Sequence, residues 1–382
     1  MLHQNSVLHH LLKYIPWHRF DALVEEHCAD ARIRTLSTKG QLVALLYGQL
    51  SGGGGLRSIV TDLSSHCGRL YHLGIKQVRR STLSDANTNR SPEVFTGLLE
   101  MLMKQAHRGL RRQLAGTTYL IDSTSVKLSA RSANWAHFAA GVYGAKTHVI
   151  YDADADCPIY AQVTASNVND ITVAQRMPVE PGATYVFDLG YYDYQWWAGL
   201  DDAGCRIVTR LKKNTPLQIV EERKVPAGDN IISDRIGFLP ARQARNRHNP
   251  MGDAVREIRV KTETGKILRI VSNDLDADAG EIASLYRRRW AIELFFRWVK
   301  QSLNIKHFVG TSGNAVRIHI AVALIAFLLL RLAYAAQSAI QSPLTFARLI
   351  KTNLMQRRPI QNLIKPPDQH VWDPRQMSFS IC

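Results

Sequence analysis

The sequence has few cysteines, and their arrangement indicates neither a zinc site nor a disulfide framework. Its 382 residues include five, an odd number, and none forms a CxxC pair. Structural zinc sites use closely spaced thiols, and small secreted proteins carry even sets of cysteines. We therefore expect free thiols and a reducing, cytoplasmic location. His66, Cys67 and His72 supply only part of a ligand set, so we interpret them as polar residues near a turn.

Acidic residues are scarce relative to basic ones. Lys and Arg number 48 against 32 Asp and Glu, so the formal net charge is +16. A strongly basic chain favours a polyanionic partner, most simply double-stranded DNA, although many basic proteins bind no nucleic acid.

The sequence also lacks a long uninterrupted apolar run. The most hydrophobic stretch, 318–336, is broken by His319 and Arg331, whereas a membrane-spanning helix needs ~20 apolar residues. We interpret it as a buried core helix, with a membrane span as the alternative. The first residues do not follow the pattern of a secretory signal.

Hydrophobic periodicity divides the chain into five segments. Residues 1–115 are predicted to be a helical N-terminal DNA-binding domain with basic helix ends, at Arg79, Arg80, Arg108, Arg111 and Arg112. Residues 116–211 form the first part of an α/β core, and 212–273 a β-rich insertion. Residues 274–342 are the helical second part of the core, and 343–382 a Pro-rich, irregular tail.

The order of elements within 116–211 predicts the architecture of the core. Three strands are followed by a helix, a strand, a helix and a strand, which is typical of a mixed α/β sheet with helices on its faces. Within 212–273, apolar and charged residues alternate, as expected of half-exposed antiparallel strands.

Three carboxylates stand in unusual contexts. Asp122 interrupts the apolar strand YLIDSTS, Asp188 ends the strand YVFDLG, and Glu293 is the one acidic residue in the basic stretch LYRRRWAIELFFRWVKQ. A charge among apolar strand neighbours costs free energy unless it is paired or binds a metal ion. The three are far apart in sequence, so only folding can bring them together.

The basic stretch reads as one long helix with a polar stripe. At ~100° per residue, Tyr286, Arg289, Glu293 and Lys300 fall within about 60° of one another, beside an apolar face. This pattern suits a phosphate held by cations next to a metal ion held by a carboxylate. The alternative is an intrahelical pair between Arg289 and Glu293, four residues apart.

The spacing Tyr286-x2-Arg289-x3-Glu293-x6-Lys300 resembles the signature of the insertion-sequence-4 family of bacterial DDE transposases. The stretches YLIDSTSVKLS and YVFDLGYYDY are similar to the two aspartate strands of that family. The resemblance implies a ribonuclease-H-like core with a β-rich insertion, and it makes Asp122, Asp188 and Glu293 the catalytic metal ligands. Oxygen ligands select Mg²⁺ or Mn²⁺, two of which can serve one active site in cut-and-paste DNA transposition.

The same resemblance suggests how DNA is held. Tyr286, Arg289 and Lys300 would contact its phosphates, and Trp290 and Trp298 would stack on bases, although either ring can instead pack in the core. Pairing two transposon ends implies a homodimer on DNA. Two other functions stay open: a catalytically inactive DNA-binding descendant, and a carboxylate-pair glycosidase, which the positive charge disfavours.

Overall fold

The computed structural model describes residues 5–111, 116–139, 141–225, 230–241, 248–302 and 308–364. The first of these ranges is helical, as its periodicity predicts. Its elements are α1 (Val7–Leu12), α2 (Trp17–Glu26), α3 (Thr38–Ser51), α4 (Leu56–Ser65), a 3-10 turn (Cys67–Leu73), α5 (Arg80–Asn89) and α6 (Glu93–Leu110). Side chains at helix starts provide local reasons for these boundaries: Ser6 and Ser37 accept N-terminal N–H groups of α1 and α3.

A mixed sheet follows, and its strands match the predicted order except for one short additional strand, β2. They are β1 (Thr118–Leu128), β2 (His137–Ala139), β3 (Val142–Asp152), β4 (Cys157–Ala165), β5 (Thr184–Phe187) and β6 (Arg206–Arg210). Helix α7 (Asp170–Ala174) precedes β5, and α8 (Tyr194–Asp202) precedes β6. β1 pairs antiparallel with β3, and β3 with β4, whereas β1, β5 and β6 run parallel.

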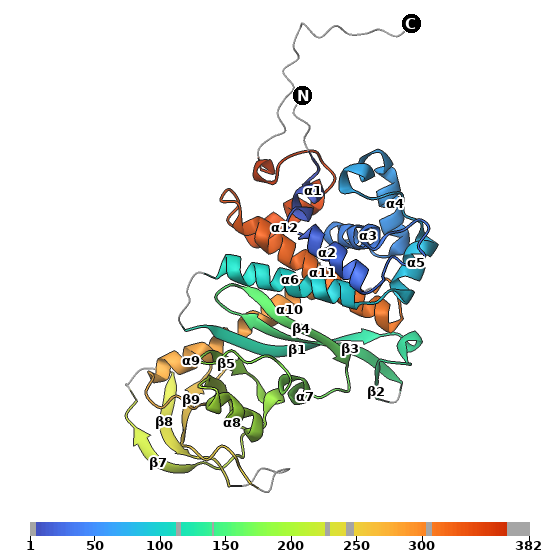
Figure 1. Ribbon diagram of the computed structural model, residues 1–382. Coiled ribbons are helices and arrows are strands. Elements are labelled where there is room, and N and C mark those ends of the chain that lie inside the picture. The colour runs from blue at the N-terminus through green and yellow to red at the C-terminus, as the bar shows by residue number, and fades with distance from the viewer. Residues whose placement is uncertain are drawn as a thin grey trace, which may run out of the picture.

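The β-rich segment extends this sheet. Strands β7 (Gln218–Arg223), β8 (Ile231–Phe238), β9 (Val255–Lys261) and β10 (Ile267–Ser272) give the strand order β2-β3-β1-β5-β6-β10-β9-β8-β7, with β4 also paired to β3. Because β10 pairs antiparallel with β6, the segment continues the edge of the core sheet. In Figure 1 these strands curve away below the core.

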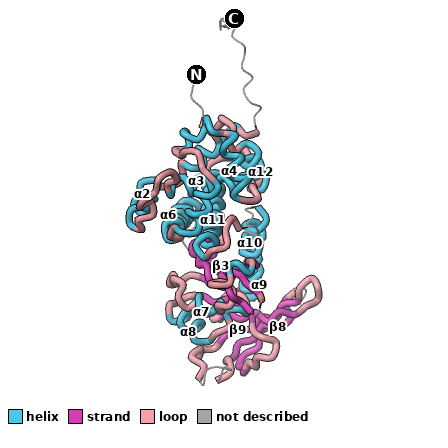
Figure 2. Tube along the Cα trace, turned by 90° about the vertical axis from the view of Figure 1, so that its right-hand side faces the viewer, coloured by secondary structure: helices cyan, strands magenta, loops and turns pink. Residues whose placement is uncertain are grey.

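The C-terminal part returns to the helices. After α9 (Ala279–Arg288) and α10 (Trp290–Ser302), helix α11 (Gly313–Ala335) packs against α3, α5 and α6, and α6 in turn packs on β4. One hydrophobic core therefore joins helices from both ends of the chain to one face of the sheet. Figures 1 and 2 show these helices gathered above the strands.

Helix α11 is long and apolar enough to cross a membrane, but 78% of its most hydrophobic window is buried inside the protein. Residues such as Val322, Ile325 and Leu328 are wholly enclosed by neighbouring elements. Its hydrophobicity is thus accounted for by burial in the core, as predicted.

The tail differs from expectation. An irregular chain was predicted from 343 onward, yet α12 spans Pro343–Asn353 and a 3-10 turn spans Ile360–Asn362. Pro343 stands at the first turn of the helix, where its missing N–H costs nothing, and Ser342 caps Thr345. Phe346 and Ile350 bury the inner face of α12. The remainder of the predicted tail, 365–382, lies outside the described residues.

The burial of α11 gives a stability prediction. Leu328→Ala should lower the free energy of unfolding by about 2–5 kcal/mol, because it leaves a cavity where a fully buried side chain stood. Leu344→Ala, at a position that is 44% exposed on α12, should change it by about 0.5 kcal/mol or less. Urea unfolding followed by circular dichroism measures both, and equal losses would contradict the packing described.

Candidate active site

Two of the predicted carboxylates lie on neighbouring parallel strands. The pairing of β1 with β5 runs from Thr118↔Thr184 to Ile121↔Phe187, so Asp122 and Asp188 each follow the last paired residue. Asp188 directly follows the carboxyl end of β5, whereas Asp122 lies within β1, which continues beside β3 to Leu128. Asp188 also caps the 3-10 turn after β5, because its Oδ1 accepts the N–H of Gly190 at 2.8 Å.

The third carboxylate arrives on α10, although the single long helix that was predicted is not formed. Helix α9 ends at Arg288, and α10 begins at Trp290. At the junction, Arg289 N donates to Tyr286 O and Ile292 N to Arg289 O, bonds that tighten the turn to three residues. Tyr286 precedes this turn and remains beside Arg289, whose guanidinium lies 5.8 Å from the tyrosine ring centroid.

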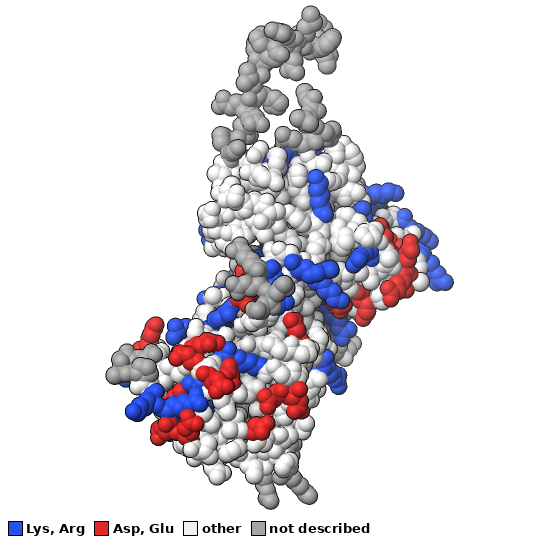
Figure 3. Space-filling model, turned by 60° about the vertical axis from the view of Figure 1, so that its left-hand side comes forward, with Lys and Arg blue, Asp and Glu red and all other residues white. Residues whose placement is uncertain are grey.

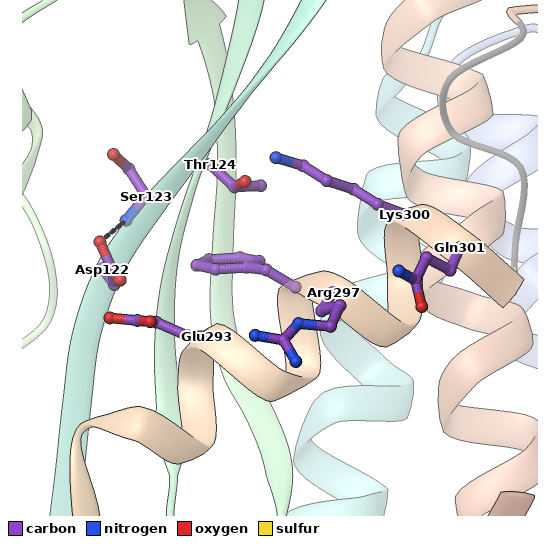
Figure 4. A pocket seen from close by; sticks show the side chains of 8 residues that line it. Asp122, Ser123, Thr124, Glu293, Arg297, Lys300 and Gln301 are labelled. Atoms are coloured by element: carbon purple, nitrogen blue, oxygen red, sulfur yellow. Dashed lines mark hydrogen bonds between the residues drawn. The ribbon is translucent and has the colours of Figure 1, made fainter. Parts of the chain in front are cut away.

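Arg289 joins two of the carboxylates. Its guanidinium lies 2.5 Å from Glu293 Oε1 through Nη2 and 3.4 Å from Asp122 Oδ2 through Nη1. The intrahelical pair that sequence left open therefore exists, and it reaches β1 as well. In Figure 4 the carboxylates of Asp122 and Glu293 point toward one another across the gap between the strand and the helix.

A cavity of about 370 Å³ opens beside these carboxylates. Its lining combines acid, hydroxyl and cationic groups: Asp122, Ser123, Thr124, Glu293, Phe296, Arg297, Lys300 and Gln301. Arg297 and Lys300 follow Glu293 along α10, and their side chains extend into the same cavity (Figure 4). On the face drawn in Figure 3, Lys and Arg side chains form a band where the helical part of the molecule meets the sheet.

The environment of Asp122 disfavours its charge. Burial is the largest cause that raises the pKa of Asp122 to about 6, and the charges of Asp188 and Glu293 add to it. The N–H of Ser123, which donates to Asp122 Oδ1 at 2.7 Å, and the guanidinium of Arg289 oppose this increase of the pKa. The negative charges of Asp188 and Glu293 are therefore close enough to Asp122 to affect its ionisation.

The carboxylates are near one another without forming a closed metal site. Among the described residues, no three His, Cys, Asp or Glu side chains are grouped closely enough to hold a metal ion. Arg289 supplies the positive charge between Asp122 and Glu293 instead. Asp188 follows the strand that pairs with β1, and its charge raises the pKa of Asp122. It is not among the residues that line the cavity.

The predicted DNA contacts divide into two groups. Arg289 and Lys300 lie at or beside the cavity. Tyr286 is 7% exposed on α9, with the guanidinium of Arg289 over its ring at 5.8 Å, so the expected exposed stripe is wrong at that residue. Trp298 packs against Phe327 of α11 with ring centroids 5.2 Å apart, whereas Trp290 is 52% exposed.

Several cavity residues were not singled out in the sequence. Arg297 stands four residues after Glu293, a spacing that places it on the same side of a helix, so this signal was present. Ser123 and Thr124 directly follow Asp122 on β1, and no local pattern distinguishes them from ordinary strand residues.

Comparison with known proteins identifies the class to which this fold and site belong. Residues 114–329 match the family described as Transposase DDE domain. A relative from Sinorhizobium fredii that is named as a transposase is 36% identical over 309 residues, which cover 78% of this chain and 85% of the relative. A second, from Geobacillus stearothermophilus and named as a transposase for an insertion sequence element, is 29% identical, and the match covers 70% of each chain.

The chain therefore belongs to the transposase DDE domain family, and it is an enzyme of DNA cleavage and strand transfer. Residues 3–76 additionally match a domain of unknown function (DUF4372). Among solved structures, a piggyBac transposase synaptic complex with hairpin DNA aligns with 96% of this chain and 83% of its own, at 10% identity and a TM-score of 0.49.

The raised pKa of Asp122 predicts a pH-dependent stability. Between pH about 4 and 6 the folded protein holds a proton on Asp122 that the unfolded chain has lost, so this group's contribution falls as pH rises through that window. Without divalent ions, Asp122→Asn should therefore raise the free energy of unfolding at pH 8 by on the order of 1–3 kcal/mol and change it little at pH 4.

Asp274 provides a control of opposite sign. It pairs with Arg206 at 3.0 Å; burial would raise its pKa, but N–H groups and this arginine lower it. Asp274→Asn should accordingly destabilise the protein at pH 8. Urea unfolding at both pH values measures the two variants, and a destabilised Asp122→Asn protein at pH 8 would refute the electrostatic account.

Proposed function

We propose that this transposase cleaves and joins DNA strands at transposon-end inverted repeats by divalent-metal chemistry, with Asp122, Asp188 and Glu293 as the metal ligands. The observation that carries the proposal is the approach of Asp122 and Glu293 to one guanidinium beside an open cavity, with Asp188 at the end of the adjoining parallel strand. Three carboxylates from two strands and a helix have no structural need to approach one another.

The topology supports a ribonuclease-H-like core. Strands β4, β3, β1, β5 and β6 lie in that order, with the first three antiparallel and the last three parallel. The insertion-sequence-4 branch and the predicted domain bounds belong to the same proposal. The β-rich segment then extends the core sheet between the second aspartate and the glutamate.

The donor set fits Mg²⁺ or Mn²⁺. All three side chains offer hard oxygen ligands. Burial, followed by the charges of Asp188 and Glu293, raises the pKa of Asp122, and a bound cation would favour the ionised carboxylates. When bound, two such ions would activate the attacking oxygen and stabilise the leaving oxygen. Asp122, Asp188 and Glu293 would hold the ions, and Arg289, which contacts one oxygen of Asp122 and one of Glu293, would be close enough to meet a phosphate at the same place.

The protein's own cations would hold the DNA backbone at the cavity. Arg289 can grip a phosphate through two N–H groups, whereas Lys300 and Arg297 act near the same space from α10. Tyr286 has a positioning role here, since its buried ring lies under the Arg289 guanidinium. Trp290, half exposed at the start of α10, is the better candidate for stacking on a base, and Trp298 for packing.

The N-terminal helices are proposed to contribute to recognition of the DNA ends. Arg79, Arg80 and Arg108 are exposed on this part of the chain, and Arg111 lies 3.7 Å from Glu180, while Arg112 lies outside the described residues. A homodimer on DNA, bringing two ends together, completes the proposal. Location in the bacterial cytoplasm follows from its substrate.

Replacing the carboxylates tests the active site. Asp122→Ala, Asp188→Ala and Glu293→Ala should each abolish cleavage of a labelled transposon-end duplex with Mg²⁺ or Mn²⁺. End binding should persist, because affinity for DNA comes mainly from phosphate contacts. Asp202→Ala, on α8 and away from the cavity, is the control that should cleave normally. Binding without cleavage by the wild-type protein would instead favour the inactive DNA-binding alternative.

Replacing Arg289 tests the phosphate clamp. Arg289→Lys keeps the charge but loses the fork, so cleavage should fall although the protein stays folded. Lys300→Ala should weaken end binding and reduce the dependence of log affinity on log salt by about one. Melting temperature, end affinity and cleavage are measured on the same Arg289→Ala protein. A stable variant with full affinity and full cleavage would remove Arg289 from the mechanism.

A further inference from the structure

A fourth carboxylate, Asp170, lies next to the proposed active site and was not selected by any sequence pattern. It occupies the first turn of α7, between β4 and β5. Three donors approach its Oδ1: Ser123 Oγ at 2.7 Å, Lys146 Nζ at 3.2 Å and His148 Nδ1 at 3.4 Å. Lys146 and His148 come from β3, and Ser123 from β1, so one oxygen joins α7 to two strands of the sheet.

Ser123 connects this carboxylate with Asp122. Its backbone N–H donates to Asp122 Oδ1 at 2.7 Å, while its hydroxyl donates to Asp170 (Figure 4 shows the first bond). Fixing the hydroxyl limits movement of the Ser123 residue and hence of the N–H that orients Asp122. A side chain that holds a residue bonded to a metal ligand typically affects the ligand's geometry.

Gly190 connects Asp170 with Asp188. A Cβ atom built on Gly190 would lie 3.0 Å from Asp188 Oδ1 and 3.5 Å from Asp170 Oδ2. The two carboxylates thus approach the same turn after β5 from different elements, and the absence of a side chain at Gly190 leaves room for both. Asp170 therefore contacts Ser123, the residue after Asp122, and lies beside Gly190 in the turn that begins at Asp188.

The environment keeps Asp170 ionised. Burial by itself would raise its pKa, but hydrogen bonds from His148 and Ser123 and the charge of Lys146 lower the pKa of Asp170 to about 2. Lys146 also donates to the carbonyl of Val168 at 3.0 Å, which ties the loop before α7 to β3. The hydrogen bond from Ser123 and the ion pair with Lys146 therefore give Asp170 the character of a fixed support.

We propose that Asp170 is a positioning residue of the active site, which orients the Asp122 carboxylate through Ser123 and supports the turn that carries Asp188. The inference rests on the proposed function, since it takes Asp122 and Asp188 as metal ligands. Asp170 acts by accepting hydrogen bonds at Oδ1, and it does not itself contact the metal ion or the DNA.

Two replacements of Asp170 test whether its role is to accept hydrogen bonds at Oδ1. An asparagine whose carbonyl oxygen takes the place of Oδ1 can still accept from Ser123, Lys146 and His148, whereas alanine accepts from none. Asp170→Ala should weaken Mn²⁺ binding, measured by calorimetry without DNA, and slow end cleavage, each by about 10- to 100-fold. Asp170→Asn should recover both to within about threefold of the wild type.

Ser123→Ala removes the other half of the same hydrogen bond. It should reproduce the loss seen in Asp170→Ala, and the double variant should be little worse than either single variant, because both changes break one connection. Asp152→Asn is the matched control: Asp152 also pairs with a histidine, His107 at 2.9 Å, but it is the last residue of β3 and does not contact Asp170. Its Mn²⁺ affinity and cleavage should equal those of the wild type.

Three results would overturn the inference. Asp170→Asn as damaging as Asp170→Ala would make Asp170 a ligand or a required charge. Wild-type Mn²⁺ affinity and cleavage in a folded Asp170→Ala protein would remove its role, as would additive losses in the double variant. Failure of the proposed function is recognised separately, because Asp122→Ala would then bind Mn²⁺ and cleave DNA as the wild type does.

Discussion

Burial of neighbouring carboxylates, balanced by a single guanidinium, is the constraint on which the candidate site depends. Asp122 and Glu293 share Arg289, and Asp188 adds its charge from the next strand. Such an arrangement costs folding free energy, because buried like charges are poorly solvated. The rest of the fold must hold two strands and one helix together against that cost.

The β-rich segment contributes to this support from a distance. Arg256 and Asp234 form a buried ion pair at 2.7 Å, and Arg256 and Arg223 both donate to the carbonyl of Leu275 just before α9. A buried pair of this kind is retained where both charges are satisfied. Because the segment fixes the start of α9, it also fixes the approach to the junction at Arg289 and so to α10.

The helices act on the other side of α10. Phe295, two residues after Glu293, packs against Tyr151 of β3 at 4.9 Å and against Phe327 of α11 at 5.0 Å between ring centroids. The apolar side of α10 therefore packs between the sheet and α11, and α11 is in turn covered by the N-terminal helices α3, α5 and α6. Glu293 is left facing the cavity, with its orientation set by packing as well as by charge.

The sequence by itself determined most of the strands, because alternation and apolar runs are local patterns. It also singled out Asp122, Asp188 and Glu293 as candidates, from their unusual sequence contexts and from the family resemblance. Tertiary structure decided the rest. A helical wheel shows neither the tightened turn at Arg289 nor the burial of Tyr286, which depends on the elements that surround α9. The helix α12 was not predicted because the prolines of the tail suggested irregularity, whereas its inner face is held by the burial of Phe346 and Ile350. Asp170 meets Ser123, Lys146 and His148 through the pairing of distant strands, and no spacing along the chain encodes that meeting.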